Sequence, residues 1–377
     1  MTQMVTAVAA VSGEIRRRKA DPPAFPSPFT RHPSPVTRHL STVTLPFLFC
    51  LILLVLAPAA LRAADDFLFS GPSPARNFQP IQFIFLHFPF ERAATVGDGV
   101  LGFNVESAEA NVIATSQGVV ESTLKFETNR TVFGLRYGLA PHWEVGLDVP
   151  FISRFGGALD PFIDEVEYIF DAGNRERDIY PNNSFGDFTV KKGDVTLFDG
   201  EKTTFALGDL WTSLKYDFAP LPDWPLLVAV RAAIKAPSGR ESNVTGSGSP
   251  DFGLGLAADY RVFSRLMTYL NMNVVFPVGP ITPAQLSLHP IFSQSFAAEL
   301  ALTKHLSALL HQAVYTSPMH GNHTRLLDGE PVEIGLGLNC AWSEALLFQF
   351  LAIDNVSPVE PAADFTVMLS MKTRIEL

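Results

Sequence analysis

A histidine and a serine stand two residues apart in the segment His305-Leu306-Ser307. On an extended strand, residues two apart share a face, so the imidazole could activate the hydroxyl as a nucleophile. Ala308 follows, although an Asn would be typical of a lipase or esterase that sits in an outer membrane. The pair also lies beside a predicted short turn. We therefore assign no catalytic residues, and a membrane-embedded esterase or lipase is the least favoured of our hypotheses.

Metal and cofactor chemistry is poorly represented. His320 and His323 stand close together, but few carboxylates and no cysteine accompany them, so we expect a solvated loop. The chain has two cysteines, Cys50 and Cys340, too few for a cysteine-based zinc cluster. No Gly-Lys-Ser/Thr sequence follows the glycines near Gly255, which excludes a phosphate loop there. We predict neither a metal site nor a cofactor.

Charged residues on the polar faces of predicted strands are the more informative set. An isolated charge in a dry protein interior is costly, so these groups indicate a polar lumen. They form either a salt-bridged network that fills the lumen, which we favour, or a pore lining with local selectivity. The candidate lumen-lining residues are Arg130, Arg136, Glu144, Asp148, Lys215, Asp217, Arg231, Lys235, Asp251, Asp259, Arg261, Glu299, Lys372 and Arg374.

The elements that must position these residues are strands. Residues 130–139, 226–236 and 364–377 alternate apolar and polar residues with a period of two. A helix would instead repeat its apolar residues every three or four positions. The alternating runs span roughly 10–14 residues, whereas strands of soluble proteins usually span about 5–6 residues.

The connections between these strands alternate in length. Short turns are expected at 140–142, 219–225, 263–265, 303–305 and 341–343, and longer loops at 154–205, 237–249, 277–291, 316–330 and 354–363. Outer-membrane barrels show this alternation of short periplasmic turns with longer external loops. We predict an all-β, transmembrane, antiparallel up-and-down barrel of about 12 strands over residues 99–377. Its last strand should pair with a first strand near 99–112, because an open edge cannot exist in lipid.

Aromatic residues agree with this arrangement. Three of the four tryptophans, Trp143, Trp224 and Trp342, stand beside the short turns. Phe151, Phe276, Phe292 and Tyr315 stand at the opposite strand ends. Two aromatic girdles at the membrane interfaces are expected of a transmembrane barrel. The sequence therefore predicts contact with lipid in the outer membrane of a Gram-negative bacterium.

Composition excludes two other classes. Apolar residues make up 47% of the 377 residues, yet no apolar run of 18 or more occurs beyond residue 61, which excludes a polytopic helical protein. The net charge is −10, and residues 64–377 alone hold 21 basic and 36 acidic residues. So acidic a chain should not bind nucleic acid.

Residues 45–61 are apolar, follow a basic stretch and precede small residues, as in a secretory signal peptide. We expect residues 1–63 to be removed by cleavage near Ala63 or Ala64. Residues 1–44 exceed a normal basic region, so we expect translation to begin near Val36 or Val43. An uncleaved membrane anchor is the alternative.

Residues 64–98 are less regular than the rest of the chain. Within them, residues 81–88 (Ile-Gln-Phe-Ile-Phe-Leu-His-Phe) would be apolar on both faces of a strand. Three alternatives remain open for this N-terminal segment: an extra strand, a plug in the lumen, or a periplasmic segment.

Three segments carry a resemblance to a known family. They are residues 71–80 (Gly-Pro-Ser-Pro-Ala-Arg-Asn-Phe-Gln-Pro), the hairpin at 134–146, and residues 175–183 (Arg-Glu-Arg-Asp-Ile-Tyr-Pro-Asn-Asn). The chain resembles the domain of unknown function 3187 family, whose members are uncharacterised bacterial outer-membrane barrel proteins. The resemblance implies a location and a fold, and it implies no activity.

We expect a narrow channel or uptake protein for small solutes, because inward side chains nearly fill a barrel of twelve strands. The alternative is a structural or interaction barrel of the envelope without transport. The apolar-x-apolar ending Ile375-Glu376-Leu377 predicts recognition by the barrel-assembly machinery. The oligomeric state is left open.

The signal segment yields the first test. N-terminal sequencing of the protein isolated from the cell envelope should begin near Ala63 or Ala64. Finding residues 1–44 still attached would contradict both the cleaved signal and the later start of translation.

Overall fold

The computed structural model describes residues 69–170, 180–219, 224–281, 286–343, 345–356 and 362–377. The predicted signal segment and both cleavage positions lie outside the described residues. In the described ranges, no helix has the length and apolarity needed to cross a membrane.

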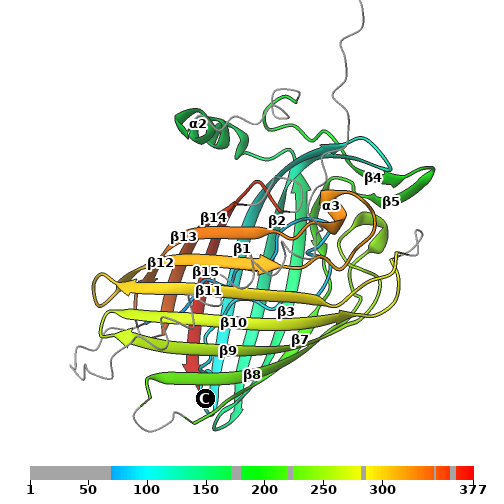
Figure 1. Cartoon of the computed structure of the whole chain (residues 1–377). Helices are drawn as coiled ribbons and strands as arrows, with labels where there is room; N and C mark the ends of the chain where they lie inside the picture. The colour runs from blue at the N-terminus through cyan, green and yellow to red at the C-terminus, as the bar shows by residue number, and fades with distance from the viewer. Residues whose placement is uncertain (1–68, 171–179, 220–223, 282–285, 344, 357–361) are drawn as a thin grey trace, which may run out of the picture. The chain divides into compact units, whose positions relative to one another are not determined.

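Twelve antiparallel strands form a closed barrel, in which each strand pairs with its neighbours in the chain (Figure 1). Register pairs from Val100 with Glu376 to Asn111 with Phe365 join the last strand to the first. The predicted all-β barrel and its closing strand are confirmed. The barrel strands are β1 (Val100–Ser116), β2 (Val120–Ala140), β3 (Trp143–Phe155), β7 (Trp211–Asp217), β8 (Leu226–Lys235), β9 (Asp251–Phe263), β10 (Leu266–Pro277), β11 (Ile291–Ala301), β12 (Leu306–Tyr315), β13 (Val332–Ala341), β14 (Leu346–Asn355) and β15 (Phe365–Glu376).

The barrel places apolar side chains outside and polar side chains inside. On β13, Ile334, Leu336 and Leu338 are 42%, 65% and 46% exposed, whereas Glu333 and Asn339 on the other face are buried. This is the reverse of a soluble protein, and it is the arrangement that a lipid-facing wall around a polar lumen requires. The outward face can therefore be read from the alternation in the sequence.

The first hairpin is longer than the sequence suggested. The strand expected near 99–112 continues to Ser116, and β2 begins at Val120, so only residues 117–119 connect the two. A tilted transmembrane strand needs about 9–11 residues, and β2 has 21. The hairpin therefore extends beyond the membrane on the side of the long loops.

The long loop expected at 154–205 is structured rather than irregular. It contains α2 (Asp160–Phe170), β4 (Phe188–Lys192), β5 (Val195–Asp199) and β6 (Thr203–Leu207). β4 pairs with the beginning of β2, β5 pairs with β4, and β6 pairs with the end of β3. These strands have five residues each, too few for a clear alternating pattern. Figure 1 shows α2, β4 and β5 at the end of the barrel opposite the C-terminus.

Arg154, near the external end of β3, ties these loops together. Its buried guanidinium donates to the carbonyl oxygens of Glu201 at 3.1 Å, Asn243 at 3.2 Å and Val244 at 3.1 Å. Asn243 ends the short 3-10 helix η2 (Glu241–Asn243). The same guanidinium lies 4.6 Å from the ring centroid of Phe188. One cation thus holds two external loops against the rim of the barrel. Another short element on this side is α3 (Arg325–Asp328).

The described part of the N-terminal segment, residues 69–98, runs through the interior of the barrel and contains no strand. Ile81 is 0% exposed and Leu86 is 2% exposed. The chain reverses at residues 80–85, where the amides of Gln82 and Phe83 both donate to the carbonyl of Gln79 at 2.9 Å. Residues 81–88 can be apolar on both faces, because the barrel wall and the rest of the inner segment bury them on every side. Residues 69–98 are called the inner segment below.

The alternation of faces is tested on β13. Leu336→Arg should lower the stability of the barrel by roughly 2–4 kcal/mol, because the guanidinium would enter hydrocarbon near the middle of the membrane. Leu336→Ala, which removes the same side chain without adding a charge, should cost far less. Urea unfolding followed by heat-modifiable gel mobility measures both, and equal losses would contradict the lipid-facing assignment.

Candidate functional site

The candidate lumen-lining residues lie on the inner face of the wall. Arg130, Glu144, Asp148, Lys215, Asp217, Arg231, Lys235, Asp251, Asp259 and Glu299 are buried, and the Arg136 side chain is nearly so. Lys372 is half-buried and Arg374 exposed, and both line a cavity described below. Arg261 is exposed as a whole, but its guanidinium lies 5.3 Å from the ring centroid of Phe69, in the inner segment.

Carboxylates of the wall accept backbone N–H groups of the inner segment. An irregular backbone inside a barrel has no ladder partners, and each unpaired amide would carry a desolvation penalty. Acids on four strands supply the missing acceptors. The pairs are Glu299 with Ser70 at 3.1 Å and Gly71 at 3.0 Å, Asp251 with Leu86 at 2.7 Å, Asp259 with Ala93 at 2.8 Å, Asp217 with Thr95 at 2.8 Å, and Glu144 with Val96 at 2.8 Å.

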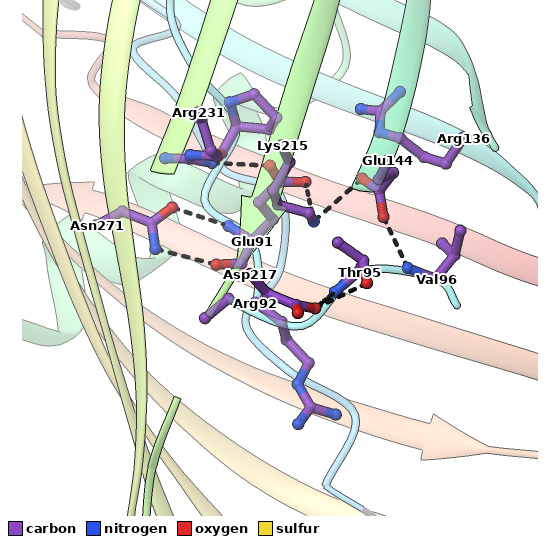
Figure 2. A network of polar contacts seen from close by, with 12 residues as sticks. Glu91, Arg92, Thr95, Val96, Arg136, Glu144, Lys215, Asp217, Arg231 and Asn271 are labelled. Atoms are coloured by element: carbon purple, nitrogen blue, oxygen red, sulfur yellow. Dashed lines mark hydrogen bonds and ion pairs between the residues drawn. The ribbon is translucent and has the colours of Figure 1, made fainter. Parts of the chain in front are cut away.

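Glu91 is the centre of an ion-pair network between the inner segment and the wall (Figure 2). Its carboxylate lies 2.9 Å from Arg231 and 3.7 Å from Lys215, and Lys215 also lies 3.1 Å from Glu144. Burial alone would raise the pKa of Glu91, but Lys215 and Arg231 outweigh it and lower that pKa to about 2. The two cations thus favour the carboxylate form of Glu91, and these ion pairs hold residues 89–93 to β7 and β8.

Other ion pairs join the two parts in the same way. Arg92 of the inner segment pairs with Asp259 at 3.0 Å, and Arg76 pairs with Glu106 of β1. On β8, Lys235 lies 2.7 Å from Asp209 and donates to the carbonyl of Ile84 at 2.8 Å. A buried charge without a partner is strongly destabilising, so these pairs neutralise charges that the interior could not otherwise hold.

The external half of the inner segment is held differently. Phe78, Ile81, Phe83 and Phe88 belong to a buried apolar cluster, which also includes Trp211 of β7. Wall residues elsewhere in this cluster include Val275, Ile291 and Leu351. The inner segment thus has an apolar half toward the external loops and a polar half, residues 89–98, toward the short turns.

A cavity of about 280 Å³ lies between the polar half and the wall at the end with the short turns. Charged side chains line it, together with Phe69 and the prolines Pro74 and Pro89 of the inner segment. A second cavity of about 20 Å³, between residues 83–87 and the wall near Trp211, has space for no more than a water molecule. The larger cavity is the only one of these two that could hold a solute.

Sequence reasoning missed the functional groups of the inner segment itself, namely Arg76, Glu91 and Arg92. It also missed Glu106 of β1 and Asp209, which lies between β6 and β7. Glu106 stands on the polar face of an alternating run beside Val105, and this position was a signal that could have found it. The inner segment has no periodicity, so its charges carried no such signal.

The residues considered for catalysis do not act as a pair. Ser307 is buried and donates to Glu299, while His305 Nδ1 lies 3.0 Å from the carbonyl oxygen of Ala341. The serine hydroxyl and the imidazole therefore each bond another group, whereas a nucleophile and its base would have to bond each other. In the described ranges, no group of three or more His, Cys, Asp or Glu side chains could hold a metal ion.

Comparison with protein families gives a direct result. Residues 48–375 match the model of the family described as "Protein of unknown function (DUF3187)". The chain belongs to this family. The match covers the whole barrel up to Ile375, and the resemblance seen in the sequence is confirmed. Comparison of the sequence with curated proteins finds no match.

Comparison with solved structures shows the fold. The crystal structure of an outer membrane channel from Pseudomonas putida F1 matches with a TM-score of 0.52 and 11% identity, over 74% of this chain and 97% of that one. The NanC porin matches with a TM-score of 0.44 and 5% identity, over 72% and 100% of the two chains. The KdgM porin in complex with disordered oligogalacturonate gives a TM-score of 0.37 and 6% identity, over 72% and 98%. The first of these similarities establishes an outer-membrane barrel fold for this DUF3187 protein, and the other two are too remote to carry an argument.

The anchoring of the inner segment is tested at Asp259. Asp259→Ala removes the acceptor of the Ala93 amide and the partner of Arg92, and each buried group left unpaired costs about 1–3 kcal/mol. Amide hydrogen exchange, followed by mass spectrometry, should accelerate about ten-fold or more in peptides covering residues 91–96. Asp194→Ala, on the exposed turn between β4 and β5, is the control and should leave this exchange unchanged. Unaltered exchange in Asp259→Ala would show that the wall carboxylates do not anchor the segment.

Proposed function

We propose that this protein is a narrow channel for small solutes in the outer membrane of a Gram-negative bacterium, and that the inner segment obstructs it in the state described. The observation that carries this proposal is the polar attachment of residues 89–98, by carboxylate–amide bonds and ion pairs, beside a cavity at the mouth of the barrel. Water can replace polar contacts of this kind one at a time, whereas a packed apolar core offers no such exchange.

The wall itself leaves room for a path. Small residues stand on the inner face where the inner segment passes: a Cβ atom on Gly253 would lie 2.5 Å from Phe88. In a barrel of this size, wall side chains can nearly fill the interior by themselves. Here a separate segment occupies that space, so displacement of the segment would leave a lumen rather than a collapsed core.

A second candidate, an envelope barrel without transport, is favoured by one observation. The apolar half of the inner segment, including Phe78 and Phe83, is packed with Trp211 in a single buried cluster. Contacts of this kind would hold the segment in place permanently. The two candidates differ in one measurable property, which is the conductance of the barrel.

Conductance across planar lipid bilayers decides between them. The intact protein should show small or infrequent openings, and a variant that lacks residues 70–95 should conduct several-fold more. Because this deletion removes much of the interior, a second variant is needed. Ala93→Cys with Ala257→Cys, in a Cys340→Ala background, places two thiols in one buried alanine cluster of segment and wall.

A disulfide between these thiols should suppress the openings, and a reductant should restore them. Folding of each variant is checked by heat-modifiable gel mobility. If the intact protein, the deletion variant and the cross-linked variant all fold and none of them conducts, the protein is an envelope barrel without transport.

A further inference from the structure

The charged groups around the larger cavity are unequal in number. Its lining includes the cations Arg92, Arg136, Lys215, Lys372 and Arg374. Its carboxylates are Glu91, Glu106 and Glu144. The cavity lining therefore holds more cations than carboxylates, although the chain as a whole is acidic.

The carboxylates of the lining are already neutralised. Glu106 pairs with Arg76, which lies outside the cavity lining. Glu91 has Arg231 at 2.9 Å, and Arg231 is also outside the lining. Glu144 accepts the Val96 amide at 2.8 Å and has Lys215 at 3.1 Å. None of the three has an unshared charge to offer to a cation in the cavity.

Of the five cations, only Lys372 and Arg374 have no acidic partner among the described residues. Arg92 and Arg136 lie 3.0 Å and 2.8 Å from Asp259 and Asp148. In the described part of the chain, by contrast, Lys372 and Arg374 have no carboxylate within 4.0 Å. The excess positive charge of the cavity therefore resides on β15.

Their positions direct both side chains toward the same space. Lys372 and Arg374 stand two residues apart, so they share the inner face of β15 about 7 Å from each other. Across the seam, Lys372 is opposite Asn104 and Arg374 is opposite Gly102. Gly102 has no side chain to cover the cavity at this point. Arg374 is exposed at the mouth, and Lys372 is half-buried deeper inside.

We propose that this cavity is a binding site for a small oxyanion, a carboxylate or phosphate, held by Lys372 and Arg374. An arginine fork matches the planar geometry of a carboxylate, and a lysine supplies a point charge. Low-dielectric walls around a cavity strengthen such an attraction. The volume of about 280 Å³ limits the ligand to a small molecule. The binding site stands independently of transport. Its role in selectivity rests on the channel function proposed above, and such a channel would prefer anionic solutes.

Binding is measured first, because it does not depend on transport. Equilibrium dialysis of the protein isolated from the outer membrane and kept folded in detergent is done at low ionic strength. It uses radiolabelled inorganic phosphate in one arm and radiolabelled succinate in the other. Lys372→Gln with Arg374→Gln should weaken binding of the preferred anion at least ten-fold, whereas Arg374→Lys should retain part of it. The matched control is Lys304→Gln, an exposed cation in a short turn at the same end of the barrel, and it should bind like the native protein.

The outcomes separate the site from the channel. Binding in one arm that the double variant loses supports the site and names the anion. Binding of neither probe, or equal binding by the native protein and the folded double variant, overturns it even if the protein conducts.

Reversal potentials in a potassium chloride gradient then test selectivity. They should indicate anion preference in the native protein and a shift toward cations in the double variant. A native preference for cations would overturn the selectivity role. Binding without any conductance would leave the site standing and refute the channel.

Discussion

The need to pair every backbone group that meets hydrocarbon is the constraint on which this structure depends. A sheet with open edges would leave unpaired N–H and C=O groups in lipid, so the sheet closes on itself through the pairing of β15 with β1. Closure gives the sheet an inner and an outer face. Because side chains alternate between these faces along each strand, one set of side chains meets lipid and the other meets the lumen. Apolar residues such as Leu336 face lipid and acids such as Glu333 face the lumen. The same closure gives the protein an interior, which must either be filled by side chains with paired polar groups or be left open to water.

The inner segment answers that requirement in two ways. Toward the external loops it fills the interior with apolar side chains, and Ile81 and Leu86 are almost completely buried there. Toward the short turns it is held by wall carboxylates, which accept amides that no strand can satisfy. The apolar half also has a polar anchor, because Asp251 on β9 accepts the Leu86 amide and lies 3.0 Å from Lys235 of β8. The polar half is the part of the interior in which a cavity remains, and the cations of β15 face it. The proposed obstruction and the proposed oxyanion site therefore lie in neighbouring regions of one interior.

Membership of the DUF3187 family and the shared fold with the Pseudomonas putida channel establish what kind of molecule this is. They do not by themselves supply a mechanism, because barrels of the same architecture serve different purposes. The arguments for a channel and for an oxyanion site come from this chain's own interior: the replaceable contacts of Glu91 and Asp259, and the uncompensated charges of Lys372 and Arg374. The hydrolase hypothesis found no support in the geometry, because Ser307 and His305 face different partners.

The sequence by itself determined the twelve strands of the barrel, their faces and the closing pair, but not the three short strands of the first long loop. A period of two is a local property, and a slip of one residue would turn every lipid-facing side chain inward, so the pattern specifies the register. The candidate lumen residues followed from the same alternation. Only the tertiary structure decided the place of residues 69–98, because a run that is apolar on both faces suits a central strand and a surrounded segment equally well. It also decided the partners: Ser70 meets Glu299 across 229 positions of the chain, and Arg154 meets Val244 across 90. Such distant pairs decide which charged side chains have a partner of opposite charge and which face the cavity without one. No local pattern records them, since they exist only once the barrel has closed around its own N-terminal segment.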